Sequence, residues 1–287
     1  YSMSQKVVKK HKNNNHYLLT SNGYWIRDFN NKIAPLDINH LVKKNEYSLF
    51  VENQLKIDSY RISPLESNIL PTHEKIMIVS DGMEFDKFKT ILPSIPKDIH
   101  IIGINRSLAK WPVNNSLPVR RMNYFINNNP FSDAVSYLPK HDYWPNCLIS
   151  LRSNAEFAKK YKGNLWYYEP VPEKEAQHNG GKGLQIDEYR NPVCTAIGIA
   201  SLFKVNKLAL VCCDDSFKTT RPSAIQLKNS YWMYPQHQIS HEFIDGSLYW
   251  LKQNEDRTIN AINCSCGPEY NNAEYICMES LMEFFNE

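Results

Sequence analysis

The chain has 287 residues, of which 42% are hydrophobic, and it carries a formal net charge of +3 at pH 7. This apolar content is enough for a folded core and argues against global disorder. Because the charge is small and the lysines and arginines are scattered, we expect no nucleic-acid partner. No run approaches 18 consecutive apolar residues, so the pattern predicts no transmembrane segment.

Cysteine usage and the N-terminal residues indicate a compartment. The chain has seven cysteines, an odd number, and Cys194, Cys212 and Cys213 fall within apolar runs. In a reducing environment such thiols act as small hydrophobic side chains. The first residues, YSMSQKVVKKHKNNN, lack the apolar core of a signal peptide. We therefore expect a cytoplasmic protein.

The residue pattern divides the chain near residue 75. Residues 1–16 are basic and rich in asparagine, which is typical of a mobile tail. Residues 17–75 contain short alternating runs such as YLLTSNGYWIRDF and EYSLFVENQLKI, and end in the proline-containing segment SPLESNILPTHEK. These runs predict a small β-rich appendage followed by a linker. Residues 76–287 are predicted to form the main, nucleotide-binding domain.

In the main domain, apolar runs alternate with stretches of helical spacing. A helix is predicted in DGMEFDKFKTIL, with Phe85, Phe88 and Leu92 on one side, and others at residues 239–252 and in the terminal NAEYICMESLMEFF. The alternation predicts an α/β fold with a Rossmann-like, doubly wound, mainly parallel sheet and the small β-rich N-terminal appendage. Strands are predicted at residues 76–80, 99–105, 123–127, 164–169, 208–213 and 258–263.

The stretch NPVCTAIGIASLFKVNKLALVCCDD, residues 191–215, carries the strongest signal for a site. Asn191 is a favoured N-cap and Pro192 suits the first helical position, so a helix of small residues is predicted here. Asn191 is also a candidate nucleotide-binding residue. The following run is apolar on both faces, as a buried parallel strand requires. Asp214 and Asp215 then lie at its carboxyl end, where open α/β sheets bind ligands.

Two further loops follow predicted strands and should reach the same edge of the sheet. Asp81 and Gly82 lie between a strand and a helix, where backbone N–H groups can face a phosphate; an ordinary tight turn is the alternative. Asn105 and Arg106 offer an amide for a base or ribose and a guanidinium for phosphate. A capped helix start on the surface is the alternative for this pair.

A third loop of this kind consists of Asn127, Asn128 and Asn129, which end another predicted strand. Their amides could contact a nucleotide, or they could form Asx turns that only shape the loop.

The order of IMIVSDGMEF, IIGINRSLAKW, YFINNNPF and NKLALVCCDDSF resembles the bacterial sialyltransferases of glycosyltransferase family 42. It also resembles the related archaeal 6-hydroxymethylpterin diphosphokinase-like proteins of the DUF115 type. The resemblance covers roughly residues 75–287. It implies a Rossmann-like fold and contact of Asn105 and of residues 127–130 with a cytidine nucleotide.

Two histidines are candidates for a catalytic base. The segment WMYPQHQISHEF, with His237 and His241, resembles the sialyltransferase segment in which a histidine acts as base before a helix. An imidazole of near-neutral pKa can remove a proton from an acceptor hydroxyl. The alternative is that both are polar residues at a helix start. A zinc site would need a third ligand, and the pair lacks the HExxH order.

Three functions remain open on the sequence. The first is a metal-independent CMP-sugar glycosyltransferase that requires no cofactor and binds a nucleotide or nucleotide-sugar donor and an acceptor. The second is an ATP- and Mg²⁺-dependent diphosphokinase with Asp214 or Asp215 on the metal. The third is a non-catalytic binding or assembly protein on the same fold. The neutral run 127–129 stands where the pterin enzymes carry acidic residues, which favours the first function. Oligomerisation is left open.

Overall fold

A computed structural model describes most of the chain from residue 44 onwards. The described residues are 9–10, 16–19, 25–29, 32–33, 44–60, 62–66, 70–112, 122–170, 184–186, 191–214, 216–217, 225–226, 232–233, 235–254, 258–266 and 269–286. No helix among them is long and apolar enough to cross a membrane.

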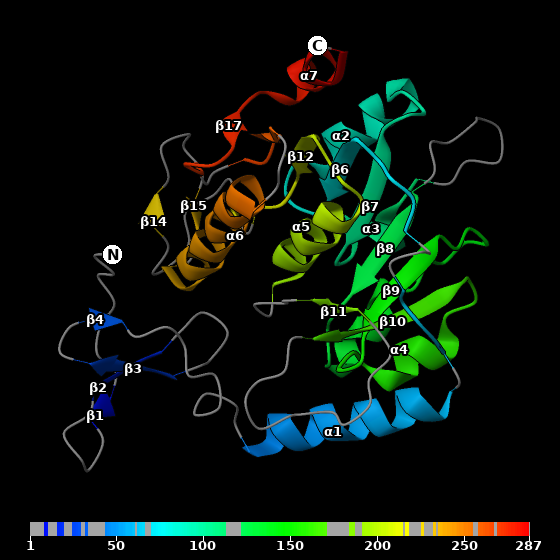
Figure 1. Cartoon of the computed structure of the whole chain (residues 1–287), viewed down its shortest axis with the longest axis vertical. Helices are drawn as coiled ribbons and strands as arrows, with labels where there is room; N and C mark the ends of the chain where they lie inside the picture. The colour runs from blue at the N-terminus through cyan, green and yellow to red at the C-terminus, as the bar shows by residue number, and fades with distance from the viewer. Residues whose placement is uncertain are drawn as a thin grey trace.

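The main body is built on a ten-stranded sheet whose paired strands all run parallel (Figure 1). The strand order is β11–β10–β9–β8–β7–β6–β12–β16–β17, with β5 also paired to β10. This order confirms the predicted α/β fold. The strands are β5 (Ser63–Pro64), β6 (Lys75–Val79), β7 (His100–Ile104), β8 (Tyr124–Asn127), β9 (Asn146–Ser150), β10 (Leu165–Pro170), β11 (Gln185–Ile186), β12 (Lys207–Val211), β16 (Asn260–Asn263) and β17 (Glu274–Tyr275).

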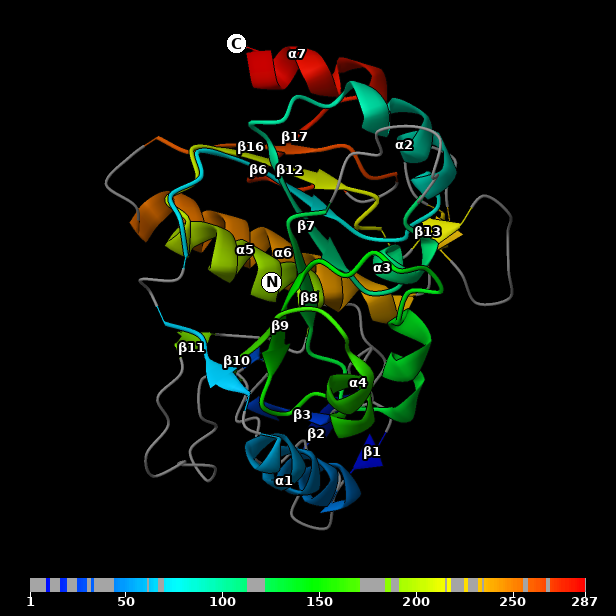
Figure 2. The same ribbon diagram turned by 90° about the vertical axis from the view of Figure 1, so that its right-hand side faces the viewer.

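Helices cover both faces of the sheet (Figure 2). Successive side chains of a strand point to opposite faces, so Met77 and Val79 of β6 join one core cluster while Ile76 and Ile78 join the other. The first cluster includes residues of α1 (Lys44–Ser59), α2 (Phe85–Ile91), α3 (Ser107–Lys110), α4 (Ala155–Lys160) and α7 (Leu281–Asn286). The second includes residues of α5 (Pro192–Leu202) and α6 (Pro235–Asn254).

The remaining elements are short. Three 3₁₀ turns are described, η3 (Leu92–Ser94), η4 (Ser132–Tyr137) and η5 (Met278–Ser280). One small antiparallel sheet joins β1 (Lys9–Lys10), β2 (His16–Leu19), β3 (Trp25–Phe29) and β4 (Lys32–Ile33). Another has the order β13–β15–β14, from β13 (Ser216–Phe217), β14 (Ile225–Gln226) and β15 (Trp232–Met233).

Strands β2 to β4 agree with the β-rich character expected after residue 16, but the run EYSLFVENQLKI was wrongly read as strand. It lies in helix α1. The reason is visible in the burial: Asn53 and Ile57 are buried four residues apart, whereas Leu55 between them is 65% exposed. A spacing of four places side chains on one helical face. The division into tail, appendage and main domain stays a prediction.

The sequence also missed a strand and part of the C-terminal structure. NCLIS forms β9, which lies between β8 and β10 in the sheet and was not predicted. The strand predicted at residues 164–169 is β10. The terminal segment begins with β17 and η5 before α7. By contrast, α2 follows the prediction, with Phe85, Phe88 and the adjoining Leu92 buried.

The cysteines divide by burial. All seven are free; six are buried, including the predicted Cys194, Cys212 and Cys213, and Cys277 is exposed. Burial raises the pKa of the Cys264 thiol to about 12 and also raises the pKa of the Cys212 thiol. A protonated, buried thiol reacts slowly, because the thiolate is the nucleophile.

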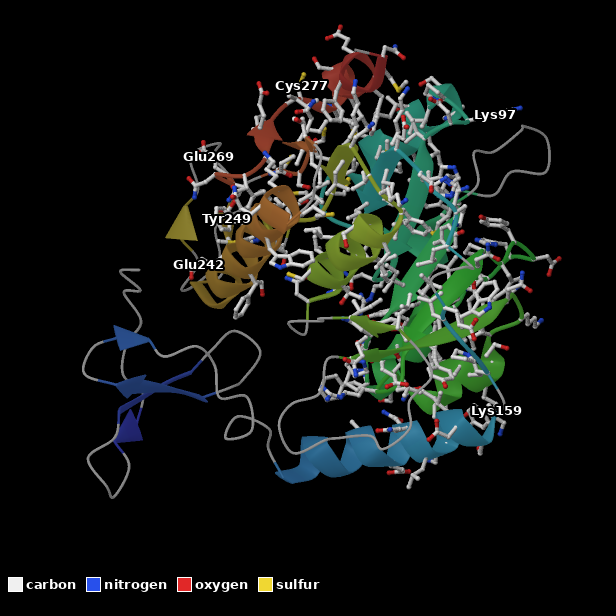
Figure 3. All side chains as sticks on the ribbon, in the orientation of Figure 1. Lys97, Lys159, Glu242, Tyr249, Glu269 and Cys277 are labelled. Carbon is white, nitrogen blue, oxygen red and sulfur yellow. The ribbon has the colours of Figure 1, made fainter. Side chains whose placement is uncertain are left out.

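We therefore expect one fast-reacting thiol in the native protein, that of Cys277, labelled in Figure 3. Titration with a chromogenic disulfide should give one equivalent in a fast phase and the other six only in denaturant. The variant Cys277→Ser should lose the fast phase. A fast phase of several equivalents would contradict the burial of the other thiols.

Candidate functional site

The strand order reverses at the centre of the sheet, between β6 and β12. From β6 the chain adds β7 through β10 on one side, and then crosses to add β12 on the other. In open α/β sheets ligands bind outside the carboxyl ends of the strands at such a point. The loop of residues 80–82, after β6, and the loop of residues 212–214, after β12, border it. The sequence predicted both loops as parts of the site.

These two loops touch each other directly. The Gly82 N–H donates to the carbonyl oxygen of Cys212 over 3.0 Å. A Cβ at Gly82 would lie closer than 3.0 Å to that carbonyl oxygen and to Oδ1 of Asp214. Cys212 itself has a left-handed backbone, with φ of 54°. The Gly82 N–H is therefore used within the protein, contrary to the expectation that it faces a phosphate.

Asp81 is paired with a cation from the next helix. Its Oδ2 lies 2.8 Å from Nζ of Lys110 in α3, and the same ammonium group donates to the Asp81 carbonyl oxygen over 3.4 Å. The Lys110 side chain is about half exposed. Arg106, just before α3, is exposed too. This edge of the sheet thus combines a neutralised carboxylate with a nearby exposed guanidinium.

Asn105 connects the loop after β7 to the loop after β6. Its Nδ2 donates to Oγ of Ser80 over 3.0 Å, and Ser80 is buried. The backbone of Asn105 is left-handed, with φ of 55°. Asparagine tolerates this conformation better than most residues. The structure therefore brings Asn105 to the β6 loop, as the sequence predicted.

The loop after β8 is shaped by two successive Asx turns, the alternative reading of this run. The Asn129 N–H donates to Oδ1 of Asn127 over 3.0 Å, and the Phe131 N–H donates to Oδ1 of Asn129 over 2.9 Å. Asn128 donates from Nδ2 to Oγ1 of Thr195, in α5, over 3.1 Å. These bonds fix the loop against the first turn of α5.

One side-chain hydrogen-bond donor of this loop has no acceptor among the described residues. Nδ2 of Asn127 is buried, and no described residue accepts a hydrogen bond from it. A buried donor without an acceptor costs about 1–3 kcal/mol. An acceptor on a bound ligand or water would remove this cost, so Asn127 remains a candidate for ligand contact.

Asn191 is the N-cap of α5, as predicted. Its Oδ1 accepts from the Val193 N–H over 2.9 Å, and its Nδ2 donates to the Ser240 carbonyl oxygen of α6 over 3.4 Å. Both ends of the side chain amide are thus used to hold α5 and α6. Asp214 is buried beside Gly82, and Asp215 lies outside the described residues.

The two candidate bases lie one turn apart on α6. His241 is 6% exposed, and its Nδ1 lies 2.7 Å from the hydroxyl of Tyr270. His237 is closer to the start of the helix, and its side chain lies outside the described part of the structure. The burial of His241 and its tyrosine partner match a structural role.

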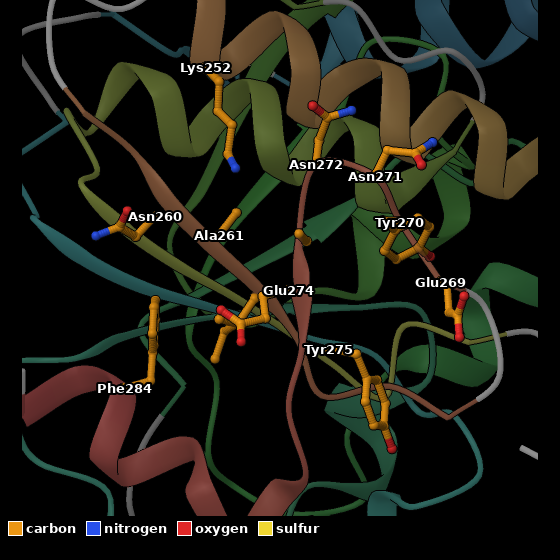
Figure 4. A pocket seen from close by; sticks show the side chains of 12 residues that line it. Lys252, Asn260, Ala261, Glu269, Tyr270, Asn271, Asn272, Glu274, Tyr275 and Phe284 are labelled. Atoms are coloured by element: carbon orange, nitrogen blue, oxygen red, sulfur yellow. The ribbon is translucent and has the colours of Figure 1, made fainter.

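A cavity of about 650 Å³ lies elsewhere, along the outer side of β16 and β17 (Figure 4). None of the predicted site residues lines it, and no motif pointed to it. Its lining residues are Lys252, Asn260, Ala261, Ile262, Glu269, Tyr270, Asn271, Asn272, Ala273, Glu274, Tyr275 and Phe284.

Comparison with known proteins supports the architecture. No family model and no curated protein sequence matches the chain. The structure of a MAf glycosyltransferase from Magnetospirillum magneticum AMB-1 is similar, with a TM-score of 0.61 at 16% identity. The chain has a glycosyltransferase-like α/β fold. The match covers 81% of this chain and 39% of the other, so this chain spans well under half of that protein. It does not distinguish family 42 from the DUF115-type proteins.

We expect glycine-to-alanine substitutions at the crowded Gly82 and at the uncrowded Gly246 to change the free energy of unfolding in opposite directions. Gly82→Ala should lower the free energy of unfolding by about 1–3 kcal/mol, because its Cβ overlaps the Cys212 carbonyl and Asp214. Gly246→Ala, in α6, should raise it by about 0.5–1 kcal/mol, since nothing lies within 4 Å of the added Cβ. Urea unfolding measures both, and a neutral Gly82→Ala would contradict the close approach.

Proposed function

We propose that the protein is a transferase that uses a nucleotide-activated donor, most like a metal-independent CMP-sugar glycosyltransferase. The observation that carries this proposal is the meeting of Ser80, Asp81, Asn105 and Asp214 at the point where the strand order reverses. This is where ligands bind in open α/β sheets. The similarity of the fold to a MAf glycosyltransferase adds support for a sugar donor.

The groups at this edge suggest how such a donor would be held. Because the Gly82 N–H is already used, the phosphate would be bound by side chains, first of all by the exposed guanidinium of Arg106; the ammonium of Lys110 is already paired with Asp81. The leftover Nδ2 of Asn127 and the amide of Asn105 would bind the base or ribose. No cofactor is required on this proposal.

Of the two histidines we propose His237 as the base. It would take the proton from an acceptor hydroxyl as that oxygen bonds to the anomeric carbon of the sugar and CMP leaves with the electron pair of the broken bond. His241 is too buried to meet an acceptor in this way. It would instead hold α6 against Tyr270.

A second candidate is a binding or assembly protein without catalysis. It is favoured by the internal use of the Gly82 N–H, the Asn191 amide and Nδ1 of His241. The Mg²⁺-dependent diphosphokinase has less support, because the run 127–129 offers neutral amides rather than carboxylates. Of its two candidate carboxylates, Asp214 is buried beside Gly82 and Asp215 lies outside the described residues.

Ligand binding separates these functions. Calorimetry should detect CMP binding without Mg²⁺, and Asn105→Gly should weaken it about tenfold, or about 1.4 kcal/mol. Glycine keeps the left-handed backbone and removes only the amide. The matched control is Lys204→Gly, at another left-handed position distant from this edge, which should leave the affinity unchanged. Mg²⁺-dependent ATP binding in place of CMP would favour the diphosphokinase, and no binding of either would favour the non-catalytic protein.

The histidines are separated by turnover and stability. His237→Ala should slow the release of CMP from a CMP-sugar by at least about a hundredfold while leaving the CMP affinity unchanged. His241→Ala should lower the free energy of unfolding by about 1–3 kcal/mol, since the Tyr270 hydroxyl loses this buried partner. Turnover loss confined to His241→Ala, at full stability, would refute the assignment.

A further inference from the structure

Helix α1 reaches the candidate site through one buried side chain. This helix precedes the central sheet in sequence and packs beside α4, as both views show (Figures 1 and 2). Asn53, in its middle, is 3% exposed. An asparagine buried to this degree needs partners for its amide, because an unsatisfied polar group in the interior is costly.

The partners of Asn53 come from two different loops. Its Nδ2 donates to the carbonyl oxygen of Pro130 over 3.0 Å and to that of Arg152 over 3.3 Å. Its Oδ1 accepts from the Ala155 N–H over 3.3 Å. Pro130 belongs to the loop after β8, whereas Arg152 and Ala155 lie after β9 and at the start of α4. One side chain thus joins α1 to both loops.

The same two loops are also bonded to each other. Oγ of Ser153 donates to the Asn127 carbonyl oxygen over 2.6 Å, and the Asn154 N–H donates to the Asn129 carbonyl oxygen over 2.9 Å. The run 127–129 therefore has the β9 loop on one side and Pro130, held by Asn53, directly after it. The backbone of this loop is therefore restricted by hydrogen bonds at both places.

We propose that α1, through Asn53, positions the loop of residues 127–129, and with it the unused Nδ2 of Asn127, for the ligand of the carboxyl edge. The ligand itself rests on the proposed function. Three hydrogen bonds from a buried side chain restrict backbone that would otherwise have to be ordered when the ligand binds, and that ordering costs affinity. A loop that is already ordered binds a ligand more tightly, because less conformational entropy is lost on binding.

On this proposal, docking of α1 against α4 and binding of the ligand are coupled. Coupling between two equilibria is reciprocal, so if docking of α1 strengthens ligand binding, then the ligand strengthens docking of α1 to the same degree. A helix that only stabilises the fold would not show this link. Anything that pulls α1 from α4 would lower ligand affinity without touching a ligand-contacting residue.

Two variants of α1 separate positioning from stability. Asn53→Leu removes all three hydrogen bonds, and Asn53→Ser is a milder version that keeps a small polar group. The matched control is Ile57→Val, one turn along the same buried face, which loosens packing but leaves these bonds in place. Hydrogen exchange of the Asn129 and Asn154 amides and the dissociation constant for CMP are measured on all three.

For both Asn53 variants we expect amide exchange at residues 129 and 154 at least about tenfold faster, and CMP binding about tenfold weaker. Ile57→Val should change neither by more than about twofold. In the wild-type protein, CMP should slow exchange of the α1 amides. Equal effects of Asn53→Ser and Ile57→Val on both readings would overturn the proposal. If the wild-type protein binds no CMP, the proposed function fails, while the exchange measurement still decides whether Asn53 sets the loop.

Discussion

The close approach of the loops after β6 and β12 constrains the rest of the site. The two strands pair along their whole length, from Lys75 with Lys207 to Val79 with Val211, so their loops emerge side by side. Only a residue without a Cβ fits at Gly82, and Cys212, whose carbonyl accepts from the Gly82 N–H, has a left-handed backbone. Asn105 joins the loop after β7 to these two loops, because its Nδ2 donates a hydrogen bond to Oγ of Ser80.

This packing decides which groups remain for a ligand. In many phosphate-binding folds, glycine-rich loops present backbone N–H groups to the anion. Here that donor is used between the loops, and Lys110 is paired with Asp81. The groups that remain for a candidate ligand are the exposed guanidinium of Arg106 and Nδ2 of Asn127.

The sequence predicted best what depends on local pattern. Strand β6 and its neighbours were found because residues such as Ile78 and Leu210 lie in runs that are apolar on both faces. The capped start of α5 followed from residue preferences, whereas β12 ends at Val211, two residues before the end of the predicted strand at Cys213. The sequence of α1 predicts strand because its short apolar runs also fit strand spacing. The four-residue spacing of Asn53 and Ile57 indicates a helix only once the burial of both residues is known.

What the sequence could not give are contacts between distant segments. Nothing near Asn53 in the chain signals partners 77 and 99 residues away. In the same way, His241 fits the pattern of a base before a helix, and only the nearness of Tyr270 and its burial point to a structural role. Hydrogen bonds within their own loop show that Asn127 and Asn129 form the Asx turns that the sequence left open, while contact of Asn127 with a nucleotide stays a prediction.

The pairing of β6 with β12 also bears on how the molecule is assembled. Strands β7 to β10 follow β6 closely and can add to it one after another, whereas β12 must return across all of them. Closing the longer loop costs somewhat more entropy, and pairings between segments distant in sequence form slowly. We expect the junction between β6 and β12 to be completed late in folding, after the half of the sheet from β6 to β10 has formed. A newly made chain would then acquire its candidate site only when most of its core already exists.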